Sequence, residues 1–149
     1  MCLAVRIVAL LAVVLMTGCV SKPRTIEVSD MPMSVWASPE DIFYDNSDTL
    51  QRRELSILLR YDKGYHSDSI PMRILTISPD SLVLEESFTL RVPHLADMRP
   101  QEQTFSYRRN VVLLRQGRYH FRLTPEEPVE GIRSVGLIIS QPENNSVNN

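Results

Sequence analysis

The chain has 149 residues, a formal net charge of −2 and a hydrophobic content of 43%. This length accommodates one domain with a sizeable core and hardly accommodates two. The charges are nearly balanced and no basic stripe alternates with aromatic residues, which argues against a nucleic-acid partner.

The first 18 residues have the layout of a bacterial signal peptide. Arg6 supplies a positive charge, and an uncharged apolar run follows over residues 7–16. This run is shorter than the roughly 20 residues that a membrane-spanning helix needs, and it has the length of a signal-peptide core. We therefore predict a lipoprotein signal peptide over residues 1–18.

Cys19 is the predicted lipid-attachment site. The segment 15–19, Leu-Met-Thr-Gly-Cys, resembles the bacterial lipobox, in which the cysteine thiol is lipidated and becomes the first mature residue; Met16 stands where Leu is usual. The alternatives are an ordinary secretory signal with a chance cysteine, or an uncleaved anchor. Cys2 would leave with the signal, so a chain lipidated at Cys19 offers no thiol chemistry and no disulfide.

The residues after Cys19 predict where the anchored chain resides. Position 20 is Val rather than the Asp that tends to hold lipoproteins at the inner membrane, which favours the outer membrane. Lys22 and Arg24 differ from the acidic stretch that resembles surface-export signals, so we expect a periplasm-facing protein of the cell envelope.

Composition divides the rest of the chain into a tether, one domain and a tail. Residues 19–33 are polar, contain Pro23 and Pro32, and predict a lipidated tether. Residues 141–149 are almost entirely polar and predict a disordered tail. The predicted domain therefore covers residues 34–140.

Hydrophobic residues in the domain recur with a period of two, which predicts half-buried strands. The clearest runs cover residues 54–61, 82–92, 118–123 and 134–140. In the second run the stripe is Leu82, Leu84, Phe88, Leu90 and Val92, and Glu86 interrupts it as a bulge or strand end would.

Weaker strand candidates and turn signals complete the pattern. Residues 41–44 and 72–78 are plausible strands, and residues 104–114 form one bent strand or two. Turn chemistry separates the runs at residues 61–64, 78–81, 116–117 and 124–125. Short strands at regular intervals predict an all-β fold, an antiparallel β-sandwich of jelly-roll or immunoglobulin-like type, with a closed barrel as the alternative.

No pattern of catalytic or ligand-binding residues emerges. His66, His94 and His120 lack a second histidine at metal spacing, and neither a zinc-protease motif nor a nucleophile elbow is present. We predict no enzyme activity and no catalytic, metal or cofactor site apart from the lipid on Cys19, and we identify no small-molecule substrate.

Three other features each have two interpretations. The segment 45–48, Asp-Asn-Ser-Asp, fits a hydrogen-bonded turn better than a calcium loop. Glu126, Glu127 and Glu130 indicate a solvated acidic loop or a partner site. Trp36, the only tryptophan, is expected to plug the end of the core rather than form an exposed binding platform.

The C-terminal half carries a family resemblance. A Gly-x-Tyr-x-Phe strand at residues 117–121 precedes Gly-Ile-x-x-Val-Gly-Leu at residues 131–137. With the lipobox, Trp36 and the Ile-Phe pair at residues 42–43, this layout resembles the GldH family of gliding-motility lipoproteins of the Bacteroidetes. The resemblance implies an accessory lipoprotein of the gliding machinery, linked to type IX secretion, without known catalytic residues.

Two functions compete at this point. The first is a non-enzymatic scaffold or accessory subunit of an envelope protein complex. The second is a carbohydrate- or peptide-binding lipoprotein that uses a sandwich face or a loop end. An envelope hydrolase is a third possibility without a positive sign. A sugar binder needs exposed rings on a shallow, polar-rimmed surface, whereas a scaffold needs an apolar patch or a free strand edge.

Overall fold

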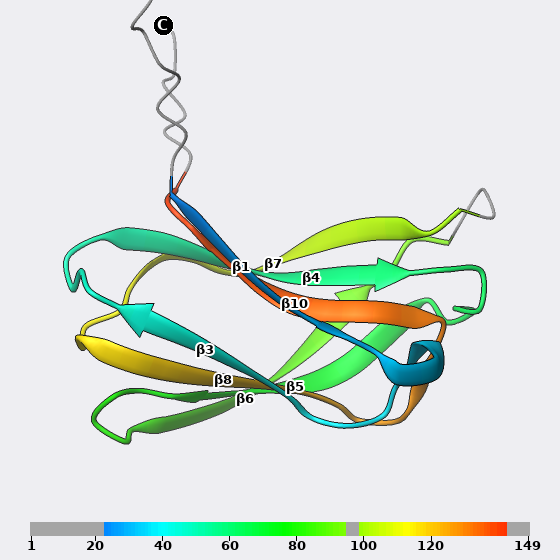
Figure 1. Ribbon diagram of the computed structural model, residues 1–149, viewed down its shortest axis with the longest axis horizontal. Helices are drawn as coiled ribbons and strands as arrows, with labels where there is room; N and C mark the ends of the chain where they lie inside the picture. Colours follow the sequence, from blue (N-terminus) through cyan, green and yellow to red (C-terminus); the bar gives the residue numbers. More distant parts are fainter. Residues whose placement is uncertain (1–22, 95–98, 143–149) are drawn as a thin grey trace, which may run out of the picture.

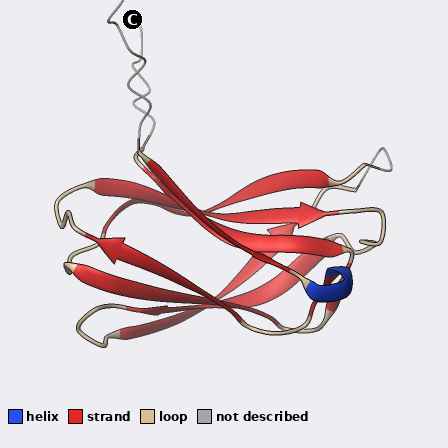
Figure 2. Cartoon of the chain, viewed as in Figure 1, coloured by secondary structure: helices blue, strands red, loops and turns tan. Residues whose placement is uncertain are grey.

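The structure is a computed structural model that describes residues 23–94 and 99–142. Cys19, the predicted signal peptide and residues 143–149 of the predicted tail lie outside the described residues. Figure 2 shows that the described chain is built from strands, apart from one short helical turn. The elements are β1 (Arg24–Asp30), the 3₁₀ turn η1 (Pro32–Ser34), β2 (Val35–Trp36), β3 (Glu40–Asn46), β4 (Arg52–Tyr61), β5 (Ser69–Ile77), β6 (Val83–Arg91), β7 (Gln101–Val112), β8 (Gly117–Pro125), β9 (Val129–Glu130) and β10 (Ile132–Ser140).

The eight long strands form two packed antiparallel sheets, as the sequence predicts (Figure 1). One sheet has the order β1-β10-β4-β7, the other has the order β3-β8-β5-β6, and β2 pairs with β9. The first long strand pairs with the last, the second with the seventh, the third with the sixth and the fourth with the fifth. A long antiparallel ribbon wrapped around a core gives this order, which makes the sandwich a jelly roll rather than an immunoglobulin-like fold.

The core lies between the two sheets and is lined by the stripes that the alternation predicts. Strands β4, β8 and β10 each point alternate side chains inward, because successive residues of a strand face opposite sides. The buried residues of these stripes are Leu55, Ile57, Leu59, Tyr61, Tyr119, Phe121, Leu123, Val135, Leu137 and Ile139.

The stripe predicted for β6 is only partly buried. Leu90 and Val92 lie in the core, whereas Leu82 and Leu84 are 67% and 51% exposed. β6 is the outer strand of its sheet, so the residues at its beginning have a neighbouring strand on one side only. The prediction that Leu82 and Leu84 are core residues is therefore wrong.

Glu86 marks neither a bulge nor a strand end, because the register between β5 and β6 runs without a shift along the whole pair. Its carboxylate accepts a hydrogen bond of 2.5 Å from the Tyr107 hydroxyl and pairs with Arg108. Tyr107 and Arg108 belong to β7, the outer strand of the other sheet. Glu86 therefore links the two sheets at their open edge, which explains a charge within an apolar stripe.

The folded domain begins earlier than predicted. Arg24–Asp30 is the edge strand β1, paired along its whole length with β10, so the tether prediction for residues 19–33 is wrong over this segment. Gly136 of β10 permits the close pairing, since a Cβ there would lie 2.3 Å from the Glu27 carbonyl oxygen. If Cys19 carries the lipid, the lead to the domain is only residues 20–23.

The weaker candidates also form strands. Residues 41–44 and 72–78 correspond to β3 and β5, and residues 104–114 contribute to a single strand, β7. The turn predicted at residues 124–125 is wrong, because β8 continues through Pro125. None of the helical segments in the described part of the chain is long and apolar enough to span a membrane.

Candidate functional site

The jelly roll has two ends that differ in chemistry. At one end β1 starts, and the connections 47–51, 78–82 and 113–116 join the strands. At the other end the connections 62–68 and 126–131 lie side by side. We call these the β1 end and the groove end (Figure 1).

A groove of about 400 Å³ lies at the groove end, between the two connections. Backbone hydrogen bonds fix its walls, from Asp62 N–H to the Gly131 carbonyl oxygen at 2.9 Å and from Glu126 N–H to the Pro71 carbonyl oxygen at 3.0 Å. Residues that line the groove are Gly64, Tyr65, His66, Ser67, Ser69, Pro71, Glu126, Glu127, Pro128, Val129 and Glu130.

Asp62 holds one wall of the groove in shape. Its carboxylate accepts hydrogen bonds from the Gly64 N–H at 2.9 Å and from the Arg133 guanidinium at 2.8 Å. These two bonds, the Gly64 bond first, lower the pKa of Asp62 below its usual range. Asp62 therefore remains ionised at neutral pH and keeps the turn tied to β10.

The groove is acidic at its rim. Glu126, Glu127 and Glu130 are exposed, and none of them forms an ion pair within residues 23–94 and 99–142. His66 is exposed on the opposite wall. The three carboxylates are solvated, as the first interpretation predicts, and they also line one wall of a groove; the partner site stays a prediction.

Aromatic rings near the groove are not available as platforms. Trp36 is fully buried and its indole N–H donates to the Ser38 carbonyl oxygen at 3.0 Å, as expected for a plug of the core. Tyr65 borders the groove but is only 6% exposed, and this burial raises the pKa of its hydroxyl to about 12. A sugar ring would find no exposed aromatic face on either residue.

The most exposed phenylalanine, Phe43, lies on the outer face of β3. His120 stacks on its ring at a centroid distance of 4.7 Å, and the Arg118 guanidinium lies 4.4 Å from the ring centre. Asp41 accepts bonds from Arg122 and His120, both at 2.6 Å; the Arg122 bond is the main reason that the pKa of Asp41 falls to about 2. His120 and Arg118 thus cover the Phe43 ring, and the polar groups beside it are already paired. A sugar ring is therefore not expected to stack on Phe43.

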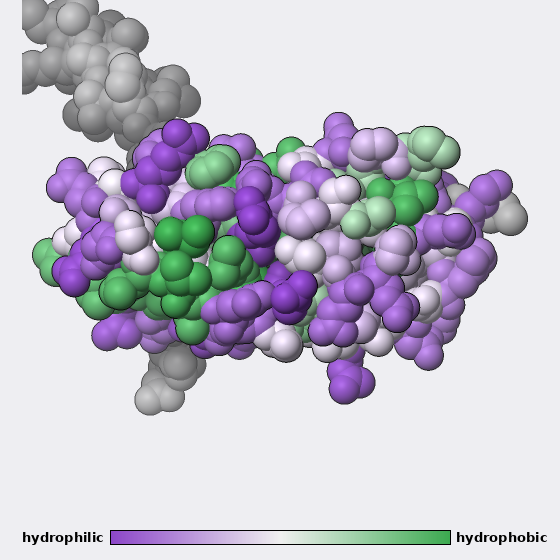
Figure 3. Space-filling model, turned by 90° about the horizontal axis from the view of Figure 1, so that it is seen from below, coloured by the Kyte–Doolittle hydropathy of each residue, from purple (hydrophilic) through white to green (hydrophobic). Residues whose placement is uncertain are grey.

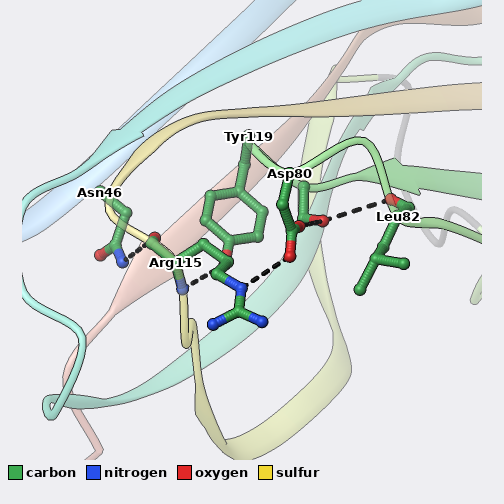
Figure 4. Close-up of polar contacts among 6 residues, drawn as sticks. Asn46, Asp80, Leu82, Arg115 and Tyr119 are labelled. Atoms are coloured by element: carbon green, nitrogen blue, oxygen red, sulfur yellow. Dashed lines mark hydrogen bonds and ion pairs between the residues drawn. The ribbon is translucent and has the colours of Figure 1, made fainter.

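The β1 end is held together by polar contacts (Figure 4). The Asn46 amide donates to the carbonyl oxygens of Leu113 and Arg115, both at 2.9 Å. The Arg115 guanidinium donates to the Asp80 carboxylate at 2.6 Å, and the backbone N–H of Arg115 donates to the Tyr119 hydroxyl at 3.0 Å. The three connections at this end therefore form one fixed unit.

The segment 45–48 covers the end of β3, which runs to Asn46, and the first residues of the connection that follows. One carboxylate oxygen of Asp48 accepts hydrogen bonds from the Leu50 and Gln51 N–H groups at 2.9 and 3.0 Å, which lowers the pKa of Asp48. The predicted hydrogen-bonded turn therefore forms later than expected, over residues 48–51, because Asp45 and Asn46 belong to β3. Of the remaining histidines, His94 lies on the surface, 2.5 Å from Asp68.

Hydrophobic side chains gather on the outside of the molecule toward the β1 end. Figure 3 views the sheet β3-β8-β5-β6 from outside, and its larger apolar surface lies on the half that belongs to the β1 end. Exposed or half-buried apolar residues at this end are Phe43, Leu50, Leu75, Ile77, Leu82, Val83, Leu84 and Leu114. Sequence alternation missed this surface, since it placed Leu82 and Leu84 in the core.

Comparisons with known proteins provide no family. No family model and no curated protein matches the chain. Among solved structures, a chain of infectious bursal disease virus, Gx strain, is similar over 85% of this chain and 34% of its own length, with 9% identity and a TM-score of 0.37. A chain of dimeric latent PorU from Porphyromonas gingivalis is similar over 84% and 13%, with 7% identity and a TM-score of 0.34. This chain thus spans about a third or less of the length of either protein, and neither structural similarity is evidence about function.

Proposed function

We propose that the protein is a lipid-anchored, non-enzymatic lipoprotein of the cell envelope that acts as an accessory subunit of a protein complex. The observation that carries the proposal is the spacing between Cys19 and β1. A lipobox-like segment ends five residues before the first strand of a jelly roll. Lipidation of Cys19 would hold the β1 end close to the membrane and leave the groove end free for a partner.

The groove supports protein binding as the activity of this subunit. Its rigid backbone walls and three exposed carboxylates suit a partner segment that carries Lys or Arg, because complementary charge steers association and sets register. The family resemblance makes the gliding and type IX secretion machinery the proposed complex. The outer membrane, facing the periplasm, is the proposed location.

Cys19→Ala should abolish lipid attachment. The thiol is the only group on this residue that can form a thioether, so we expect an unprocessed precursor or a released domain and no palmitate labelling. Membrane fractionation and radiolabelled palmitate measure this. The substitution lies before the first strand, so the fold should be retained. A Cys19→Ala variant that fractionates and labels like the wild type would contradict the anchor.

Loss of the groove carboxylates should weaken partner binding. Envelope fractions are captured through a C-terminal tag on the wild type and on the triple variant Glu126→Gln, Glu127→Gln, Glu130→Gln. Recovery of the complex should fall about tenfold or more, the change that 1.4 kcal/mol of binding free energy produces.

A matched control removes three carboxylates from strand surfaces instead, with Glu27→Gln, Glu85→Gln and Glu102→Gln. These residues are exposed, and the ion pairs of Glu85 and Glu102 are surface pairs of small energy. Equal recovery from groove variant and control would exclude the groove as the contact. Recovery of the lipoprotein alone, together with binding to a glycan array, would instead support the carbohydrate-binding alternative.

A further inference from the structure

The chain length between Cys19 and the first strand limits how far the domain can lie from a membrane. Five residue steps separate Cys19 from Arg24, the first residue of β1. Even a fully extended chain covers only about 17 Å over five steps. Any lipid on Cys19 therefore keeps Arg24 within that distance of the lipid surface, a short reach compared with the size of a folded domain.

The strand pairing determines which end of the domain is held there. Arg24 pairs with Ser140, and Ser140 pairs with Glu54 near the start of β4. The connections 47–51, 78–82 and 113–116 all belong to this same end, because they join β3 to β4, β5 to β6 and β7 to β8. With lipid on Cys19, the β1 end would thus be the part of the domain that faces the membrane.

Each of these three connections presents one leucine to solvent. Leu50, Leu82 and Leu114 are 86%, 67% and 70% exposed. Val83 and Leu84 follow at 62% and 51%, and among the most exposed large apolar side chains of the described residues only Met33 lies at the groove end. Clustered exposed apolar residues mark a surface that a membrane or another protein covers (Figure 3).

The leucines sit on fixed supports. Asp48 caps the turn that carries Leu50, the Ser78 backbone N–H donates to the Leu82 carbonyl oxygen at 2.9 Å, and Asn46 holds the carbonyl groups on both sides of Leu114. Because the backbone of these connections is fixed, the leucine side chains stay outside the core. Little conformational entropy of the backbone is then lost when the leucines bind another surface.

The distribution of charge favours the β1 end over the groove end as the side that faces an anionic lipid surface. At the β1 end the exposed Arg52, Arg115 and Arg118 accompany the leucines, and the exposed Asp45, Asp48 and Asp80 match them in number, so these charges balance. The groove end exposes Glu126, Glu127 and Glu130 along one wall, against Lys63 and the Asp62-paired Arg133 as its nearby basic residues. Anionic phospholipid headgroups attract arginine near the surface and repel carboxylates.

We propose that the β1 end docks on the phospholipid leaflet that holds the anchor, with Leu50, Leu82 and Leu114 inserted at the boundary between headgroups and acyl chains. The inference rests on lipidation at Cys19. It adds a defined orientation: the domain lies on the membrane rather than floating on a tether, and the groove points away from it. One lipid anchor and three apolar side chains then act as a combined attachment.

Site-specific fluorescence tests the orientation. The full-length protein is expressed with Leu82→Cys or Leu114→Cys, purified as the lipoprotein, labelled with an environment-sensitive dye and reconstituted in vesicles of phosphatidylethanolamine and phosphatidylglycerol. The sequence holds no cysteine other than Cys2 and Cys19, so a lipidated, processed chain offers one reactive thiol. We expect a blue shift, and loss of most of the fluorescence when brominated lipids are included. Glu127→Cys at the groove end is the matched control and should keep its fluorescence.

Vesicle flotation separates failure of docking from failure of the anchor. Protein that floats with vesicles while the Leu82 and Leu114 probes behave like the Glu127 probe is anchored but not docked, which overturns the inference and leaves the proposed function intact. Quenching at Glu127 alone overturns the orientation. Protein that neither floats nor labels with palmitate overturns both the inference and the proposed function.

A further variant, Leu50→Ser with Leu82→Ser, tests whether the leucines insert as a set. The Leu114 probe should lose its quenching while flotation persists, and unchanged quenching would contradict this.

Discussion

Replacement of Trp36 by Ala should lower the free energy of unfolding by about 3–5 kcal/mol, the range for removal of a large buried aromatic side chain. Trp36 has no exposed surface, and its strand β2 pairs with β9 at the groove end. The substitution removes the packing contacts of the buried indole and leaves a cavity. The two-residue strands β2 and β9 are too short to move in and fill it. Urea unfolding of the detergent-solubilised lipoprotein, followed by far-ultraviolet circular dichroism, measures the change.

Two variants serve as controls for this result. Trp36→Phe keeps most of the apolar volume and loses the hydrogen bond to Ser38, so its destabilisation should be clearly smaller. Leu114→Ala removes a side chain that is 70% exposed and should change stability by about 0.5 kcal/mol or less. If Trp36→Ala unfolds at the wild-type urea concentration, Trp36 is not a structural plug and a binding role for it would have to be reconsidered.

The alternation of apolar residues predicted the central strands because those strands bury one face continuously. β4, β8 and β10 have neighbours on both sides, so every inward position is covered. β6 has a neighbour on one side only, and there the same alternation placed Leu82 and Leu84 inside when they are exposed. A sequence pattern shows the side to which a residue points and does not show whether anything lies on that side.

The strand order and the first strand were beyond sequence reasoning for a different reason. β1 pairs with β10, so residues 24–30 find their partners at residues 134–140, at the opposite end of the domain. Nothing local distinguishes such a strand from a polar tether between Pro23 and Pro32. The choice of a jelly roll over an immunoglobulin-like sandwich depends on the same long-range pairing.

Only one wall of the groove could be predicted from the sequence. The clustering of Glu126, Glu127 and Glu130 in the sequence indicates a partner site as one of its two interpretations. The opposite wall, from Gly64 to Ser69, comes from a turn some sixty residues away, and only the folded structure brings it there. Gly131 carried the one usable signal, because a lone glycine between two strands indicates a turn or a close backbone approach.

Gly131→Ala should lower the free energy of unfolding by about 2–5 kcal/mol and disrupt the groove. Gly131 has a φ of +77°, which an L-residue adopts only with strain, and a Cβ there would lie 2.0 Å from the Tyr65 nitrogen. The connections 62–68 and 126–131 would have to separate, which also breaks the bond from Asp62 N–H to the Gly131 carbonyl oxygen. We expect a lower urea midpoint and weaker capture of the partner complex.

Gly64→Ala is the matched control. Its Cβ would meet Asp62 Oδ1 at 3.1 Å and the Gly131 Cα at 3.3 Å, so a shift of a few tenths of an ångström suffices and the loss in the free energy of unfolding should stay below about 1 kcal/mol. Equal stability and equal capture for the two alanine variants would mean that the two connections are not held in contact, and the rigid acidic groove would lose its physical basis.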